Sequence, residues 1–112
     1  MSNYSLLIVV LEGCGYSKAA IDFLGTYNIK KKIIKVTYED KEKYKTNSIQ
    51  TYPQIYLKKN KSSLLLGGYD DLVKSFNMFY KKYDQRDIIM FKNNNLDWSE
   101  KSILRLIELI NS

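Results

Sequence analysis

Residues 5–17, SLLIVVLEGCGYS, join an apolar segment to a short loop that contains the only cysteine of the chain. The segment from Ser5 to Leu11 is apolar after its first residue and rich in branched side chains, which predicts a strand buried on both faces of a sheet. The next segment, from Ser17 to Tyr27, has its apolar residues on one side of a helix. The sequence therefore predicts a strand, a loop with Cys14, and a helix.

The rest of the chain continues this alternation. Strands are expected at residues 32–38, 52–57 and 64–66, and a short helix within residues 39–50. Asp70 is the predicted N-cap of the next helix, and a last helix is expected to begin near Asp97, with Glu100 completing a capping box. The apolar residues of that last helix are expected to form one buried stripe: Ile103, Leu104, Leu106, Ile107, Leu109 and Ile110.

The order of these elements predicts the fold class. A strand–helix–strand opening implies a parallel pair of strands, and the later hairpin adds antiparallel strands. We expect an α/β protein of one domain, residues 1–112, in which helices flank a mixed four-stranded sheet.

The composition limits the chemistry. One cysteine excludes a disulfide within the chain, and a chain with one cysteine and no histidine is not expected to hold structural zinc. We find no signal peptide and no run of about 20 apolar residues, so we expect a cytoplasmic protein with no membrane partner. The net charge of +6 fits a solvated lysine-rich surface or an acidic partner. Nucleic acid is not the expected partner, because no nucleic-acid-binding motif is present.

Cys14 lies where a reactive thiol is expected. Its loop follows a sheet strand, at the end where open α/β sheets bind ligands. The next helix directs its first N–H groups and its positive dipole end toward the thiol, which stabilises the thiolate. Gly13 and Gly15 allow another molecule to approach the sulfur closely. The alternative is an inert cysteine that packs as a small apolar residue.

Three segments of the chain resemble glutaredoxins. Cys14-Gly15-Tyr16-Ser17 resembles the active-site tetrad in its one-cysteine form, with Ser17 in place of the second cysteine. Residues 51–56, TYPQIY, resemble the family's Thr-x-Pro loop and the strand after it, and residues 67–72, GGYDDL, resemble its Gly-Gly-x-Asp-Asp turn. The segments follow in the family's order and at about its spacing. The resemblance implies a thioredoxin-like fold and glutathione as the working thiol.

The resemblance also implies a set of site residues. It makes Cys14, Tyr16 and Ser17 the catalytic residues, and it implies a cis bond before Pro53, placed against Cys14. Without the resemblance, a trans proline in a turn is the better expectation. The γ-glutamyl end of glutathione would lie at Tyr69 and Asp70, and its extended backbone would pair with Thr51 and Tyr52. The implied contacts of glutathione are Cys14, Tyr16, Thr51, Tyr52, Pro53, Gly68, Tyr69 and Asp70.

The chain departs from the family pattern in three places. Many glutaredoxins have a lysine three residues before the cysteine, where this chain has Leu11 followed by Glu12, and this change disfavours the thiolate. Lys18 is a candidate replacement cation. Gln50 stands where a basic residue is frequent. Residues 84–97 resemble an insertion before the last helix, which is expected to pack as an extra strand or turn, or to contact a partner through Ile88, Ile89, Met90 and Phe91.

The implied activity is glutathione-dependent thiol–disulfide exchange, in which Cys14 takes the glutathionyl group from a glutathionylated protein. Two alternatives stay open. One-cysteine glutaredoxins with glycine after the cysteine resemble carriers of a [2Fe–2S] cluster, which two chains would share through Cys14 and two glutathiones. The other alternative is a catalytically weak glutaredoxin-like domain that acts by binding partners. The chain is expected to be a monomer, or a homodimer where a cluster bridges it.

Overall fold

Four strands form one mixed sheet in the computed structural model, which describes residues 4–112. The strands are β1 (Tyr4–Leu11), β2 (Lys31–Val36), β3 (Gln54–Lys59) and β4 (Ser62–Gly67), and their order across the sheet is β2-β1-β3-β4. β1 pairs in parallel with β2 and antiparallel with β3, and β3 and β4 form an antiparallel hairpin. The predicted α/β class and mixed four-stranded sheet are confirmed. Residues 1–3 of the predicted domain lie outside the described residues.

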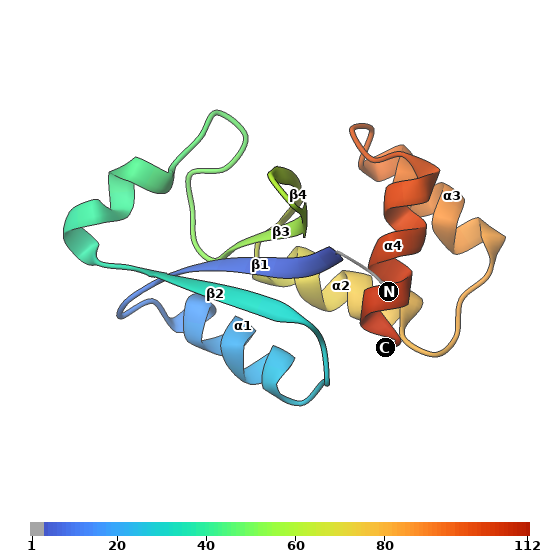
Figure 1. Cartoon of the computed structure of the whole chain (residues 1–112), viewed down its shortest axis with the longest axis horizontal. Helices are drawn as coiled ribbons and strands as arrows, with labels where there is room; N and C mark the ends of the chain where they lie inside the picture. The colour runs from blue at the N-terminus through green and yellow to red at the C-terminus, as the bar shows by residue number, and fades with distance from the viewer. Residues whose placement is uncertain (1–3) are drawn as a thin grey trace.

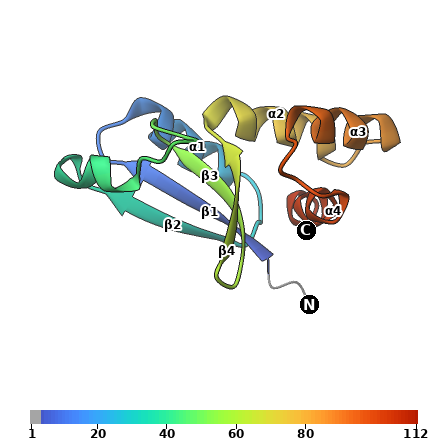
Figure 2. The same cartoon turned by 90° about the horizontal axis from the view of Figure 1, so that it is seen from above.

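Four α-helices and one 3₁₀-helix connect and flank the strands. They are α1 (Gly15–Gly25), η1 (Tyr38–Tyr44), α2 (Tyr69–Phe79), α3 (Gln85–Asn94) and α4 (Glu100–Ile110). α1 and α2 lie on the same side of the sheet, while α3 and α4 stand beyond β4, at the opposite end of the molecule from η1 (Figures 1 and 2). Among residues 4–112, no helix is long and apolar enough to span a bilayer.

The main core lies between the sheet and the helices. Side chains alternate along β1, so Leu6, Ile8 and Val10 point to the face that α1 and α2 cover. The same core cluster includes Phe76 of α2 and Ile110 of α4. One apolar cluster therefore joins the first strand to the last helix.

The second face of the sheet has a smaller apolar cluster, Leu7, Val9 and Val36. The partly buried side chains packed against it are Leu11, Ile34, Tyr52 and Tyr56. Two side-chain hydrogen bonds join η1 to Tyr52 and to the start of β3. The Tyr52 hydroxyl donates to the carbonyl of Lys41 at 2.6 Å, and the Gln54 amide donates to the carbonyl of Tyr44 at 2.9 Å. The short helix expected within residues 39–50 is thus η1.

Three predicted helix starts are wrong. α1 begins at Gly15, two residues before the expected Ser17. α2 begins at Tyr69 with Gly68 as its N-cap, so Asp70 is an exposed residue of the first turn. The carboxylate of Asp71, at the third helical position, accepts the Gly68 N–H at 3.0 Å, and this bond fixes the start of the helix two residues earlier than expected. α4 has Ser99 rather than Asp97 as its N-cap, because the Ser99 hydroxyl accepts a backbone N–H of the first turn.

The predicted apolar stripe of α4 is correct except at Leu104, which is 46% exposed. Its five other members are buried: Ile103, Leu106, Ile107, Leu109 and Ile110.

Residues 85–94 form helix α3, so the expectation of an extra strand or turn is wrong. A reciprocal capping box starts this helix: the Asp84 carboxylate accepts the Asp87 N–H, and the Asp87 carboxylate accepts the Asp84 N–H. Ile88 and Phe91 are buried in the main core, while Ile89 and Met90 are exposed.

The turn between α3 and α4 is fastened to the edge strand β4. Trp98 is buried, and its indole N–H donates to the carbonyl of Leu65 at 3.0 Å. Its ring meets that of Phe91 edge-on, with centroids 5.1 Å apart. The segment after residue 84 is therefore part of the core and covers the β4 side of the sheet.

Candidate functional site

Cys14 is the N-cap of α1, directly after β1 and its turn. Gly13 makes this turn with φ = +76°, a left-handed conformation that favours glycine. The carbonyl of Cys14 accepts the N–H of Lys18 at 3.1 Å, which begins the helical ladder. The thiol is half-buried and lies beside the unpaired N–H groups of the first helical turn, as the sequence predicted.

Ser17 supports the thiolate from the first turn of α1. Its side chain is buried, and its hydroxyl oxygen accepts the N–H of Leu11 at 3.1 Å. Burial raises the pKa of the Cys14 thiol, but hydrogen bonds from the Ser17 hydroxyl and from the backbone N–H groups of Ser17 and Tyr16 outweigh burial. The net result is a pKa below the ordinary value of 9.0. The arrangement therefore favours a nucleophilic thiolate.

The loop before β3 brings a second backbone segment to the sulfur. The Tyr52–Pro53 peptide bond is cis, as the resemblance implied. The frequency of cis proline in proteins alone favoured a trans bond. The Sγ atom of Cys14 lies 3.8 Å from the carbonyl oxygen of Tyr52, to which the thiol donates. Residues 38 positions apart in the sequence thus meet at the reactive atom.

A pocket of about 440 Å³ opens on the Tyr52 side of Cys14. We call it the Tyr69 pocket. Tyr16 and Tyr69 both line it, their rings are tilted by 40° with centroids 6.2 Å apart, and Tyr16 is 66% exposed. The N-terminus of α2 closes one end, at Gly68 and Asp70. Seven of the eight residues that the resemblance implied as ligands line it: Tyr16, Thr51, Tyr52, Pro53, Gly68, Tyr69 and Asp70.

A second pocket, of about 370 Å³, lies on the β2 side of Cys14 and includes Cys14 in its lining. We call it the Val36 pocket. Leu11, which stands where many glutaredoxins have a lysine, lines this pocket, and so does Lys18, the candidate replacement cation. Lys18 forms an ion pair with Asp22 at 2.9 Å. The remaining lining includes Glu12, Ile21, Lys35 and Val36.

Lys35 is a pocket cation that the sequence reasoning did not single out. It lies 21 positions after Cys14, and only the parallel pairing of β1 with β2, which sets Val10 beside Lys35, brings it to the site. The alternation of side chains between the two faces of β2, combined with its parallel pairing to β1, would have placed Lys35 beside the site. Gln50, by contrast, is exposed and outside both pockets.

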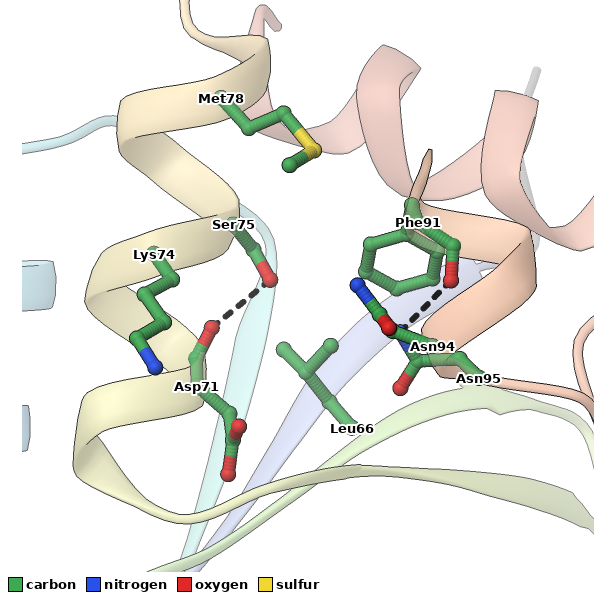
Figure 3. A pocket seen from close by; sticks show the side chains of 8 residues that line it. All are labelled: Leu66, Asp71, Lys74, Ser75, Met78, Phe91, Asn94 and Asn95. Atoms are coloured by element: carbon green, nitrogen blue, oxygen red, sulfur yellow. Dashed lines mark hydrogen bonds between the residues drawn. The ribbon is translucent and has the colours of Figure 1, made fainter. Parts of the chain in front are cut away.

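A third pocket, of about 230 Å³, lies between α2 and α3 (Figure 3). Two of its polar side chains bond within their own segments: the Ser75 hydroxyl donates to the carbonyl of Asp71 at 2.8 Å, and the Asn95 amide donates to the carbonyl of Phe91 at 2.8 Å. Cys14 is not in its lining. We therefore place the candidate site at Cys14 and its two adjoining pockets.

Metal ligands do not gather elsewhere in the described part of the chain. Within residues 4–112, no three or more cysteine, aspartate or glutamate side chains are grouped so that they could hold a metal ion. No protein-family model matches the sequence, and no curated protein matches it significantly.

Proposed function

We propose that this chain is a glutathione-dependent thiol–disulfide oxidoreductase of thioredoxin-like fold, which removes glutathionyl groups from proteins through Cys14. The observation that carries the proposal is the contact between Cys14 and the cis-proline loop, 3.8 Å from the sulfur to the carbonyl oxygen of Tyr52. Tyr52, the acceptor in that contact, lines the Tyr69 pocket, which gathers residues from all three glutaredoxin-like segments, and Cys14 lines the Val36 pocket.

The topology supports the thioredoxin-like part of the proposal. A parallel β1-α1-β2 unit is followed by an antiparallel β3-β4 hairpin and α2, and the cis-proline precedes β3. The reactive residue lies at the carboxyl end of β1, where open α/β sheets bind ligands.

The Tyr69 pocket offers complementary groups to the γ-glutamyl end of glutathione, which has both a carboxylate and an ammonium group. The N-terminus of α2 suits the carboxylate, because its first N–H groups and dipole attract anions. The exposed carboxylate of Asp70 suits the ammonium. The Tyr52 backbone, beside the sulfur, suits the extended peptide between the two ends.

The reaction has two exchange steps. The Cys14 thiolate attacks the glutathione sulfur of a glutathionylated protein, the Cys14–glutathione disulfide forms, and the protein leaves as a thiolate that takes a proton from water. A second glutathione, as thiolate, then attacks the glutathione sulfur of this mixed disulfide. Glutathione disulfide is released, and the Cys14 thiolate returns. Glutathione supplies the two electrons, and Ser17 has no sulfur with which to intercept the intermediate.

The test is glutathione-dependent reduction of a glutathionylated peptide. Wild type should turn over, and Cys14→Ser should lose all turnover. Asp70→Asn should raise the KM for the peptide with a smaller change in kcat, because it removes a ground-state contact. Asp97→Asn, which removes an equally exposed carboxylate outside the Tyr69 pocket, should behave as wild type. Full turnover by Cys14→Ser would refute the mechanism.

A [2Fe–2S] carrier is the second candidate, and the open surface beside Cys14 favours it. A Cβ atom at Gly15 would meet nothing within 4 Å, and the neighbouring Tyr16 is 66% exposed, so a second chain has access to the sulfur. Because such a cluster takes four thiolates and each chain offers only Cys14, two chains and two glutathiones would have to hold it. Anaerobic reconstitution with glutathione should then yield a brown dimer, and a colourless monomer would remove this candidate.

A further inference from the structure

Strand β2 forms one edge of the sheet and is rich in lysine. Four of the seven residues from 30 to 36 are lysines: Lys30, Lys31, Lys32 and Lys35. β2 is the terminal strand in the order β2-β1-β3-β4, so among residues 4–112 a strand lies on one side of it only (Figure 1).

The outer side of β2 presents backbone groups that no strand of the described chain pairs. The carbonyls of Lys30 and Val36 point to β1, where they accept the N–H groups of Leu6 and Glu12 at 3.0 Å. Because backbone groups alternate along a strand, the N–H and C=O groups of Lys31, Ile33 and Lys35 point outward. The lysine side chains alternate as well, so positive charge borders this edge on both faces of the sheet.

The positive charge of this edge is not neutralised nearby. None of the four lysines takes part in the ion pairs found among residues 4–112. The four strands contain no aspartate or glutamate. Two acidic side chains, Glu12 and Asp22, line the Val36 pocket together with Lys35, and Asp22 is already paired with Lys18.

We propose that the outer edge of β2 binds an extended acidic segment of a partner protein as a fifth strand. The added backbone would pair with the outward groups of Lys31, Ile33 and Lys35, and acidic side chains would lie across from the lysines. An extended peptide uses both the backbone row and the charge. Nucleic acid or a lipid surface would use the charge alone, and β2 has no exposed aromatic side chain on which a base could stack.

The direction of β2 gives this edge a functional relation to Cys14. The strand ends at Val36, which lines the same pocket as Cys14. A segment paired parallel to β2 would therefore lead its following residues toward the thiol, and an antiparallel segment would lead its preceding residues there. The binding itself does not rest on the proposed redox activity, since the edge and its lysines are independent of the sulfur.

The competing explanation is protective. Natural proteins place lysines on edge strands to prevent pairing with other strands, and on that explanation the edge binds nothing. The two explanations make opposite predictions for an acidic strand-forming peptide.

The experiment uses the full chain and a fluorescein-labelled peptide of alternating glutamate and valine, followed by fluorescence anisotropy. We expect saturable binding that weakens with salt. The triple variant Lys30→Gln, Lys32→Gln, Lys35→Gln should bind about tenfold or more weakly, since each cross-strand charge pair contributes a fraction of the affinity. A matched triple, Lys82→Gln, Lys92→Gln, Lys101→Gln, removes the same charge from equally exposed positions and should bind within about twofold of wild type.

Two further probes separate strand pairing from charge. In two versions of the peptide, alternate residues are N-methylated, so that each version lacks the backbone N–H donors of one edge. At least one of the two should bind about tenfold more weakly than the unmethylated peptide. Cys14→Ser should bind the peptide as wild type does, so failure of the redox proposal would leave this result standing.

Three outcomes would overturn the inference. Absence of peptide binding would assign the lysines to edge protection. If both N-methylated peptides bound as tightly as the unmethylated peptide, the interaction would be reduced to charge. Tighter binding of a single-stranded oligonucleotide or of phosphatidylserine vesicles, lost in the β2 triple variant, would assign the surface to that partner instead.

Discussion

Replacing Ser17 by alanine should separate the two functions of its hydroxyl. The oxygen accepts the N–H of Leu11 at 3.1 Å, and the proton is donated toward the sulfur of Cys14. Ser17→Ala leaves the Leu11 N–H without this partner, which costs about 1–3 kcal/mol when the site is closed to water. Because Leu11 is only half-buried, we expect the lower end, about 1 kcal/mol at neutral pH.

The second effect grows with pH. In the wild type the pKa of the Cys14 thiol is below the 9.0 of an unfolded thiol, so the thiolate adds stability that is complete above pH 9.0 and is lost as pH falls through the folded pKa. Ser17→Ala raises the folded pKa and removes part of that gain. The difference in unfolding free energy between wild type and Ser17→Ala should therefore increase from neutral pH to pH 9.0.

Urea unfolding across this pH range, together with thiol alkylation rates, measures both effects. The Cys14 thiol of Ser17→Ala should be alkylated more slowly than that of wild type at neutral pH, and the variant should remove glutathionyl groups more slowly. Both rates should approach those of wild type as the pH rises. Ser75→Ala is the matched control, since Ser75 is also a buried helical serine, but its hydroxyl donates to a carbonyl of its own helix. An unchanged alkylation profile in Ser17→Ala would refute the role of this hydroxyl in thiolate stabilisation.

Three other substitutions test the packing around the site. Trp98→Phe should cost about 1–3 kcal/mol in urea unfolding, because a strand carbonyl loses its buried donor. Gly67→Ala should cost more than about 1 kcal/mol, since Gly67 has φ = +139° and a Cβ atom there would collide with the Asp71 side chain that caps α2; unchanged stability would contradict this geometry. Ser17→Cys places a second thiol one helical turn from Cys14, and mass spectrometry should detect an intramolecular disulfide that displaces glutathione.

The four strands and the order of elements could be predicted because each strand has a short group of apolar residues, and polar or glycine residues separate these groups along the chain. The placement of Cys14 between a strand and a helix follows from the same pattern, although its position as the N-cap does not, since the helix was expected to begin at Ser17. The contact of Cys14 with Tyr52 could not be derived from local chemistry, because the sequence around Pro53 does not tell whether the Tyr52–Pro53 bond is cis or trans. Only the resemblance to a family predicted it.

The wrong predictions, at the start of α2 and at residues 85–94, arose where the hydrophobic pattern allows more than one local structure. Asp70 and Asp71 are both good capping residues, and the structure chooses Asp71 because its carboxylate reaches back to Gly68. Residues 85–94 have only two buried apolar side chains, so their helical period was weak. The tertiary contact of Trp98 with β4, which holds this region to the sheet, has no local signature.

The single core cluster that contains both Leu6 and Ile110 has a consequence for the newly made chain. About 100 residues separate these two positions, which is about 5–20 s of synthesis at about 5–20 residues per second. During that time the apolar face of β1 has no α4 to cover it. We therefore expect the nascent chain to be a client of holding chaperones until α4 has emerged from the ribosome.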